Sequence, residues 1–272
     1  MIDLHSHTTA SDGEYPPEEQ VALAASKGVT VLAVTDHDTV GGVEACRRVA
    51  AKLGVRLVPG IEISTSLNRR EVHILGHFVD PAEPHLARFE QRLKAERERR
   101  MELMVEKVKG LGFPVTMEMV RQLAGDVSLT RPHLARVLTE LGYTSSPKDA
   151  FTRFLGDGKP AYVPRLELPP KEAIELIRGA GGTATVAHPG MTRIDRRELE
   201  ELKRDGLVGI EVGHSDHPPS QQEKLARWAD ELDLVKTAGS DFHGPTVSPG
   251  RSFGTVTMSP AELARLEARR SQ

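Results

Sequence analysis

The sequence predicts an α/β fold in which about seven strand–helix units form a barrel, interrupted by a helical insertion. Short β-rich runs alternate with helical patterns in the first 82 residues and again after residue 165. Residues 83–165 contain helical patterns and no clear strand before Ala161–Val163. Strand–helix alternation implies parallel strands joined by crossovers, and this many units fit a barrel better than a short open sheet.

The expected elements follow from hydrophobic period and from the turn residues between them. Each strand is a short run rich in Val, Ile, Leu and Thr, and seven are expected: Met1–His5, Val31–Thr35, Arg56–Ile63, Val72–Phe78, Thr183–His188, Val208–Val212 and Leu234–Ser240. Helices are expected at Pro17–Lys27, Gly42–Leu53, Lys171–Gly179, Arg196–Asp205 and Ser220–Asp233, and one more follows Pro260.

The insertion, residues 83–165, divides the barrel into a first part, 1–82, and a second part, 166–272. It opens with a long charged helix, Pro84–Lys109, which Gly110 and Gly112 close, and further helices are expected at Met117–Ala124, Pro132–Leu141 and Pro147–Leu155. It holds 15 Lys and Arg against 11 Asp and Glu, whereas the rest of the chain holds 21 against 28. One interpretation is a solvated helical face. The other is a basic substrate-binding lid that attracts anionic substrates.

Composition excludes several classes of protein. Charged residues make up 28% of the chain and hydrophobic residues 38%, which fits neither a disordered nor a membrane protein. No apolar run approaches the ~18 residues of a membrane span, and the first residues have no secretory pattern. The single cysteine, Cys46, cannot form an intrachain disulfide, so we expect a cytoplasmic protein. No dense basic stripe predicts binding to duplex DNA.

Histidines and carboxylates recur at the ends of the predicted strands. They lie in the segments DLHSHTTASDG, AVTDHDT, PGIEIS, EVHILGHF, TVAHPG and AGSDFHG. In a parallel α/β barrel these ends meet at one mouth, where active sites are built. A lone histidine beside a strand is usually structural, but repetition at six strand ends indicates a metal centre. Nine candidate ligands result: His5, His7, Asp12, His37, Glu62, His73, His188, Asp241 and His243.

The donor set predicts two or three divalent ions with Glu62 bridging. Imidazole and carboxylate suit manganese, zinc or iron, and the absence of thiolate ligands argues against a structural cysteine-type zinc site. Three ions would leave a positive pocket that suits a phosphate group. Clustered ions also lower the pKa of a bridging water toward ~7.

These six segments resemble the ordered motifs of the polymerase and histidinol phosphatase (PHP) family. The inserted TRPHLARVL and FLGDGKPAYVP resemble its branch of nucleoside 3′,5′-bisphosphate phosphatases, whose members also act as 5′→3′ exonucleases on short oligoribonucleotides. The resemblance implies a distorted (β/α)7 barrel with two or three metals, manganese above all and otherwise zinc or iron. It places one metal on His5, His7, Glu62 and Asp241, a second on Glu62, His73 and His188, and a third on Asp12, His37 and His243.

The expected reaction is hydrolysis of a phosphate ester by a metal-bridging hydroxide. The substrate would be the 3′-phosphate of a nucleoside 3′,5′-bisphosphate, which yields 5′-AMP from the adenosine compound, or a short 5′-phosphorylated RNA. Arg131 is the first candidate for a phosphate clamp, with His133 and Lys159 beside it. Arg165 is a weaker candidate. His214 or His217 could act as general acid, and the sequence does not distinguish them.

Three alternatives remain open. The first is a PHP phosphatase acting on histidinol phosphate, a sugar phosphate or a nucleoside monophosphate. The second is a metal-dependent amidohydrolase or deaminase, since H-x-H after the first strand also opens that barrel superfamily. The third is a metal-stabilised binding module without turnover. No membrane partner is expected.

Overall fold

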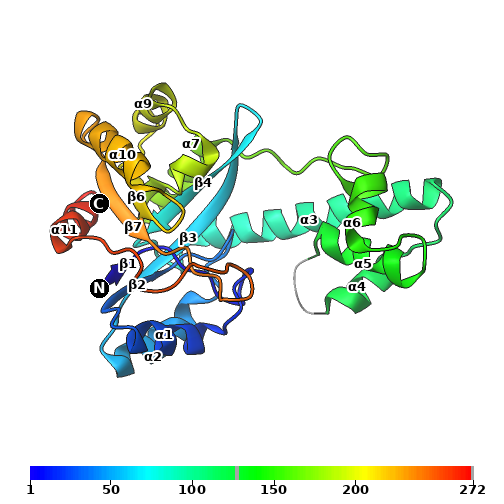
Figure 1. Ribbon diagram of the computed structural model, residues 1–272, viewed down its shortest axis with the longest axis horizontal. Coiled ribbons are helices and arrows are strands. Elements are labelled where there is room, and N and C mark those ends of the chain that lie inside the picture. The colour runs from blue at the N-terminus through cyan, green and yellow to red at the C-terminus, as the bar shows by residue number, and fades with distance from the viewer. Residues whose placement is uncertain (126–128, 271–272) are drawn as a thin grey trace. The chain divides into compact units, whose positions relative to one another are not determined.

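The computed structural model describes residues 1–125 and 129–270, and the chain forms two compact units (Figure 1). Residues 1–87 and 167–272 form the first unit, and residues 88–166 form the second. No helix in the described part of the chain is long and apolar enough to cross a membrane.

The first unit is built on one seven-stranded sheet whose strands follow the order of the chain. They are β1 (Ile2–Asp3), β2 (Val31–Val34), β3 (Arg56–Leu67), β4 (Arg70–His77), β5 (Thr183–Val186), β6 (Gly209–His214) and β7 (Val235–Gly239). The sheet curls until its first and last strands meet, because Leu4 donates its amide hydrogen to the Ala238 carbonyl at 3.0 Å and Ser6 bridges to Phe242. The result is the expected distorted barrel, nearly closed.

One strand runs against the expected direction. β1, β2 and β3 are parallel, as are β5, β6 and β7, but β4 is antiparallel to both of its neighbours. Only Asn68 and Arg69 separate β3 from β4, and both adopt positive φ, 51° and 62°, as in a tight hairpin turn. A parallel connection needs a dozen or more residues, so the expectation of an all-parallel sheet was wrong here.

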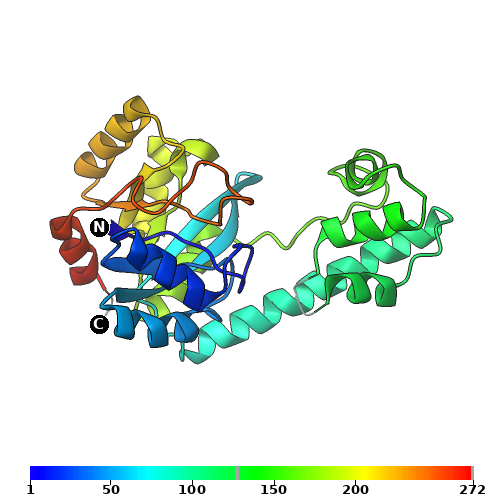
Figure 2. The ribbon, with the colours of Figure 1, turned by 60° about the horizontal axis from the view of Figure 1, so that its bottom comes forward.

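Helices surround this sheet in the first unit (Figure 2). They are α1 (Pro17–Ser26), α2 (Val43–Leu53), α7 (Pro170–Gly179), α8 (Pro189–Thr192), α9 (Arg196–Arg204), α10 (Pro219–Glu231) and α11 (Pro260–Ala268). Their apolar faces bury the strands: Leu32 and Val58 are fully buried among residues of α1, α2 and α11. This packing holds the strand ends, and the loops that follow them, in fixed positions.

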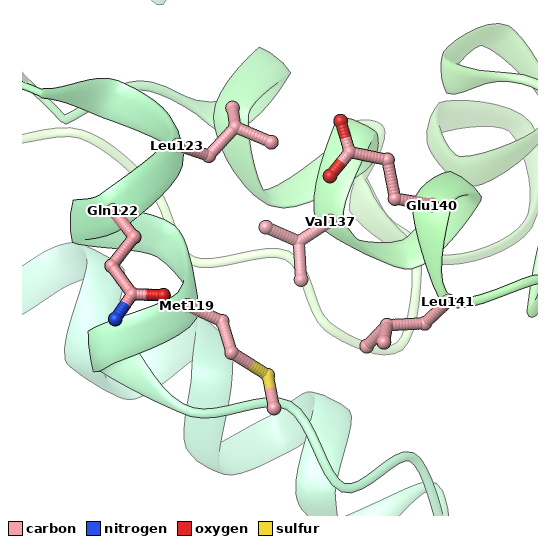
Figure 3. A pocket seen from close by; sticks show the side chains of 6 residues that line it. All are labelled: Met119, Gln122, Leu123, Val137, Glu140 and Leu141. Carbon is pink, nitrogen blue, oxygen red and sulfur yellow. The ribbon is translucent and has the colours of Figure 1, made fainter.

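The second unit is helical. It contains α3 (Pro84–Gly110, which begins in the first unit), α4 (Met117–Ala124), α5 (Arg131–Glu140), α6 (Pro147–Ala150) and a π-helical turn, Phe151–Leu155. Met104, Leu134 and Leu155 are among its fully buried core residues. A shallow pocket lies between α4 and α5 (Figure 3).

The strand expected at Ala161–Val163 does not form. Tyr162 instead donates its amide hydrogen to the Lys159 carbonyl at 2.9 Å, which makes a turn. Pro160 and Pro164 flank this stretch, and proline cannot donate to a strand ladder.

Candidate metal centre

The structure brings all nine predicted ligands to the barrel mouth. His5 and His7 follow β1, His37 follows β2, Glu62 lies within β3, His188 follows β5, and Asp241 and His243 follow β7. His73 lies near the beginning of β4, yet it reaches the same end of the barrel because β4 is antiparallel. Its neighbour on the same strand, His77, lies at the other end, where its Nε2 is 2.9 Å from the Leu4 carbonyl oxygen.

Glu62 is the centre of the cluster. Its side chain is 1% exposed, and each carboxylate oxygen faces a different set of imidazoles. Oε2 lies 3.2 Å from His5 Nε2, 3.1 Å from His7 Nε2 and 3.2 Å from His37 Nδ1. Oε1 lies 3.0 Å from His73 Nδ1 and 3.1 Å from His188 Nε2. A carboxylate placed in this way can serve two neighbouring cations at once.

Asp241 completes a compact group with His5 and His7. Its Oδ1 lies 3.3 Å from Nε2 of each histidine, and these two nitrogens are 3.1 Å apart. Asp241 Oδ1 is buried and accepts no hydrogen bond. Asp241 and His188 adopt positive φ, 52° and 28°, a conformation that is uncommon for non-glycine residues.

A third group lies around Asp12, whose side chain is 55% exposed. Asp12 Oδ1 is 3.3 Å from His243 Nε2, and Oδ2 is 3.8 Å from His37 Nε2. His7 Nδ1 lies 3.7 Å from Asp12, whereas His7 Nε2 faces Glu62, so the His7 ring contacts two of the groups. Three sets of donor atoms, each within 4.8 Å of one another, result: His7, Asp12, His37 and His243; His5, His7 and Asp241; and His37, Glu62 and His73.

These donors fit divalent cations. Asp241 Oδ1, His7 Nδ1, His37 Nδ1, His73 Nε2 and His188 Nδ1 are buried without a hydrogen-bond partner. Buried polar atoms are normally paired, so several orphaned atoms in one cluster indicate a missing ligand. Imidazole and carboxylate donors together suit transition-metal ions.

The pKa values of the histidines in the cluster are shifted because buried carboxylates and imidazoles lie close together. Burial lowers the pKa of His7, but hydrogen bonds and charge from Asp241 and Glu62 raise it to about 9. Burial also opposes the charged form of His73, yet Glu62 and Glu71 raise its pKa to about 10. Burial lowers the pKa of His37 to about 3. His7 and His73 therefore favour the protonated form at neutral pH, so a cation that binds their nitrogens has to displace a proton.

Glu62 and Asp241 are held as anions by these imidazoles. Burial alone would raise the pKa of each carboxyl group. The charges of His5 and His73, with a hydrogen bond from His188, hold the pKa of Glu62 well below its usual range. Those of His5 and His7, with a hydrogen bond from His214, do the same for Asp241. Both carboxylates are therefore ready to bind a cation.

Sequence reasoning missed Glu211 and Arg251. Glu211 is 1% exposed, its Oε1 lies 3.0 Å from His5 Nδ1, and its Oε2 accepts the His188 amide hydrogen at 2.7 Å. It therefore orients two ligand candidates, as outer carboxylates do around metal-bound histidines. A signal was present, since Glu211 is an acid inside a buried strand, in EVGHSDH. Arg251 contacts Asp241, and no strand end marks its position.

Asp36 also orders the site without belonging to the donor sets. It accepts hydrogen bonds from the Thr8 amide at 2.7 Å, the Thr8 hydroxyl at 2.8 Å and the Ser11 hydroxyl at 2.8 Å. These bonds fix the loop that carries Asp12. Gly239 allows the end of β7 to pack closely against His5, because a Cβ at position 239 would lie 2.3 Å from His5 Cβ.

The two candidate general acids are engaged at both ring nitrogens. His214 Nδ1 accepts the Asp216 amide hydrogen at 3.0 Å, and its Nε2 lies 3.2 Å from Asp241 Oδ2. His217 Nε2 accepts the Gly190 amide hydrogen at 3.1 Å, so Nδ1 donates to the Val212 carbonyl at 3.0 Å. A ring tied at both nitrogens holds its proton within the protein. These contacts hold both rings in place, and the general-acid role of His214 or His217 stays a prediction.

The predicted substrate residues lie in the second unit. Arg131 donates to Asp157 at 2.8 Å, and its guanidinium lies 5.6 Å from the Phe151 ring centroid and 5.7 Å from that of Tyr162. His133 Nδ1 accepts the Thr130 amide hydrogen at 3.1 Å, so it caps α5. Lys159 is exposed.

A second arginine adds to this cationic group. Arg100 Nε donates to the Val163 carbonyl at 2.8 Å, and its Nη2 is buried without a partner. Burial, together with the nearby charges of Arg131 and Arg165, lowers the pKa of Arg100 to about 10.

A cavity of about 390 Å³ opens beside the cluster in the first unit. His73 and His188 line it, together with Arg70, Glu71, Met191, Thr192 and Arg193. Arg70 donates to the carbonyls of Thr192 and Arg193 at 2.8 and 2.9 Å, so it ties the β3–β4 hairpin to the segment after β5. A small molecule could reach Glu62 and its imidazoles from this side.

Comparison with known proteins was made by sequence and by structure. A model of the PHP domain matches residues 3–113. The chain is 40% identical over 247 residues to a 5′-3′ exoribonuclease of Haemophilus influenzae, covering 89% of this chain and 90% of the relative. It is 36% identical over 258 residues to a 3′,5′-nucleoside bisphosphate phosphatase of Chromobacterium violaceum, covering 93% and 90%.

A solved structure extends the likeness to the fold. A Bifidobacterium adolescentis protein, assigned as a metal-dependent phosphoesterase, superposes with a TM-score of 0.80 at 31% identity. The superposition covers 99% of this chain and 96% of that one.

Proposed function

This chain belongs to the PHP family, and we propose that it hydrolyses the 3′-phosphate of nucleoside 3′,5′-bisphosphates, with short 5′-phosphorylated oligoribonucleotides as further substrates. It is a metal-dependent hydrolase of phosphate esters. The observation that carries the proposal is the Glu62 carboxylate, which lies between two sets of imidazoles. The similarity to the phosphatase and the exoribonuclease above, which extends over about nine-tenths of this chain, supports it.

The nine donors at the mouth would hold two or three divalent ions, and manganese is the ion we propose. When bound, such ions make hydroxide available near neutral pH and stabilise charge on phosphoryl oxygens. Glu62 and Asp241 supply the negative charge that binds the ions. Glu211 holds the His5 ring by its Nδ1 and thereby presents Nε2 to the cluster. His214 holds Asp241 Oδ2 in the same way.

We propose that the cationic group of the second unit binds a phosphate group. Arg131 and Arg100 offer guanidinium donors, and Arg100 Nη2 has no partner within the described residues. Guanidinium binds two phosphate oxygens with fixed geometry. Asp157, which is 76% exposed, occupies Arg131 in the structure and would be displaced by a phosphate. His133, as a helix cap, would support Arg131 rather than contact the ligand.

Substrate profiling tests this function. Manganese-loaded protein is supplied with adenosine 3′,5′-bisphosphate, a short 5′-phosphorylated RNA, histidinol phosphate, a sugar phosphate and AMP, and phosphate release is followed. The proposal expects the bisphosphate to be turned over with the highest kcat/KM, giving 5′-AMP. Turnover of histidinol phosphate or the sugar phosphate alone would leave the chemistry intact and refute the substrate. We further propose that the enzyme acts in the cytoplasm.

A further inference from the structure

In the loop after β7, Arg251 contacts Asp241, a member of the candidate metal cluster. Arg251 Nη1 donates to Asp241 Oδ2, and it lies 3.4 Å from the Asp241 carbonyl oxygen. Its Nε and Nη2 donate to Asp216 Oδ2, at 3.1 and 2.5 Å. The Arg251 side chain is only 17% exposed. One guanidinium therefore ties the residue after β7 to the loop after β6.

The two oxygens of Asp241 have different surroundings. Oδ1 faces Nε2 of His5 and of His7, each at 3.3 Å, and accepts no hydrogen bond. Oδ2 faces away from those nitrogens and contacts His214 Nε2 at 3.2 Å together with Arg251. Two donors on one oxygen fix the rotation of the carboxylate, and the free oxygen then points at the cluster.

Local sequence explains why the arginine reaches Asp241. Phe253 packs on Phe242 with ring centroids 4.4 Å apart, and both rings are buried. Gly250 and Gly254 flank the segment with φ of 96° and 85°, values that a side chain would strain. Phe253 packs on Phe242, the residue that follows Asp241. Arg251 lies two residues before Phe253, and its side chain therefore faces the Asp241 carboxylate.

We propose that Arg251 is a positioning residue, which fixes the Asp241 carboxylate for a divalent ion and is itself fixed by Asp216. It acts through Asp241 and does not touch the substrate. The inference takes from the proposed function only that the cluster binds metal. A planar fork can hold two carboxylates at once, whereas the ammonium of lysine cannot reproduce that geometry. The positive charge alone would oppose a nearby cation, so geometry and charge act in opposite directions and can be separated.

Three variants separate the effect of the guanidinium geometry from the effect of its charge. Arg251→Lys keeps the charge and loses the fork, Arg251→Gln loses both, and Asp216→Asn loosens the anchor without touching the cluster. Arg265→Lys is the matched control, because Arg265 pairs with Asp233 at 2.5 Å outside the cluster. Manganese affinity is measured by calorimetry without substrate, thermal unfolding is followed for the metal-free proteins, and kcat and KM are measured at saturating manganese.

The proposal expects manganese affinity to fall about 10- to 100-fold in Arg251→Lys and Arg251→Gln, the range for residues that orient metal ligands. A smaller fall is expected in Asp216→Asn and none in Arg265→Lys. At saturating manganese, Arg251→Lys should recover a kcat and KM near those of the wild type. Metal-free Arg251→Lys should unfold near the temperature of Arg265→Lys.

Other outcomes would overturn the proposal that Arg251 is a positioning residue. Unchanged affinity in Arg251→Lys, or tighter binding in Arg251→Gln, would make the arginine a counter-charge only. A KM raised at saturating metal would place it on the substrate. A metal-free Arg251→Lys protein that unfolds well below the control would make it a fold residue. Wild-type protein that binds manganese but leaves the bisphosphate intact would refute the proposed substrate and leave this inference standing.

Discussion

Replacing Glu62 by glutamine removes the charge that the whole cluster shares while keeping the shape of the side chain. Glu62 is 1% exposed and lies 3.0–3.2 Å from five imidazole nitrogens. Loss of one partner from a buried ion pair costs about 3–5 kcal/mol. The imidazoles can release protons in response, so we expect the lower end, a loss of about 3 kcal/mol in the free energy of unfolding.

The effect on metal binding and activity should be larger. Both sets of imidazoles lose their common carboxylate, so Glu62→Gln should bind at least one manganese ion fewer per chain. Activity should fall at least about 1000-fold, or about 4 kcal/mol in activation free energy. Denaturant unfolding of the metal-free protein, metal analysis after gel filtration and phosphate release from adenosine 3′,5′-bisphosphate measure the three quantities.

A surface carboxylate provides the control. Glu267 pairs with Arg56 at 2.6 Å and is 39% exposed, so Glu267→Gln should cost less than about 1 kcal/mol and leave metal content unchanged. The reasoning is refuted if Glu62→Gln keeps the wild-type metal content and a kcat within about tenfold of the wild type.

Further predictions concern pH, an outer carboxylate and the second phosphate. Because the pKa of His7 is raised to about 9 in the metal-free site, manganese must displace its proton at pH 7. Affinity should therefore rise with pH up to about 9 for the proton of His7, and up to about 10 for that of His73, by up to about tenfold per unit for each proton displaced. Calorimetry in buffers of different ionisation enthalpy should detect the protons, and a flat profile would contradict this. Glu211→Gln should weaken manganese binding about 10- to 100-fold while kcat recovers at saturating metal, and unchanged affinity would show that His5 needs no such support. Arg131→Lys should raise KM for the 3′,5′-bisphosphate but not for adenosine 3′-monophosphate, which lacks the second phosphate; an equal rise for both would remove Arg131 from that role.

The sequence was sufficient to predict the barrel and the gathering of its ligands. Parallel strands must end at a common edge, so histidines and carboxylates that follow different strands meet even when some 200 residues separate them, as His5 and His243 do. His73 was assigned to the cluster although it precedes the end of its strand. Its place became intelligible only with β4 antiparallel: the expected strands left residues 64–71 between them, and the structure extends both strands until only the turn at Asn68 and Arg69 remains.

What the sequence could not predict are the contacts set by tertiary packing. Arg251 is one arginine among many, and its contact with Asp241 depends on the stacking of Phe253 on Phe242 and on the pairing with Asp216. Glu211 has the pattern of a strand residue, and its role depends on facing His5 across the barrel. The hydrogen bonds that the Asp216 and Gly190 amides donate to the His214 and His217 rings are also set by tertiary packing, and the acid role of either histidine stays a prediction.

The central claim is that the histidine and carboxylate cluster of this PHP protein hydrolyses a nucleoside bisphosphate. The most direct measurement is phosphate release from adenosine 3′,5′-bisphosphate by manganese-loaded wild-type protein, by the His5→Ala/His7→Ala variant and by His85→Ala. His85 is 66% exposed at the start of α3 and serves as the control. We predict 5′-AMP and phosphate from the wild type and from His85→Ala, and no release from the double variant. Equal rates in all three proteins, or a metal-saturated wild type that releases no phosphate, would contradict the account.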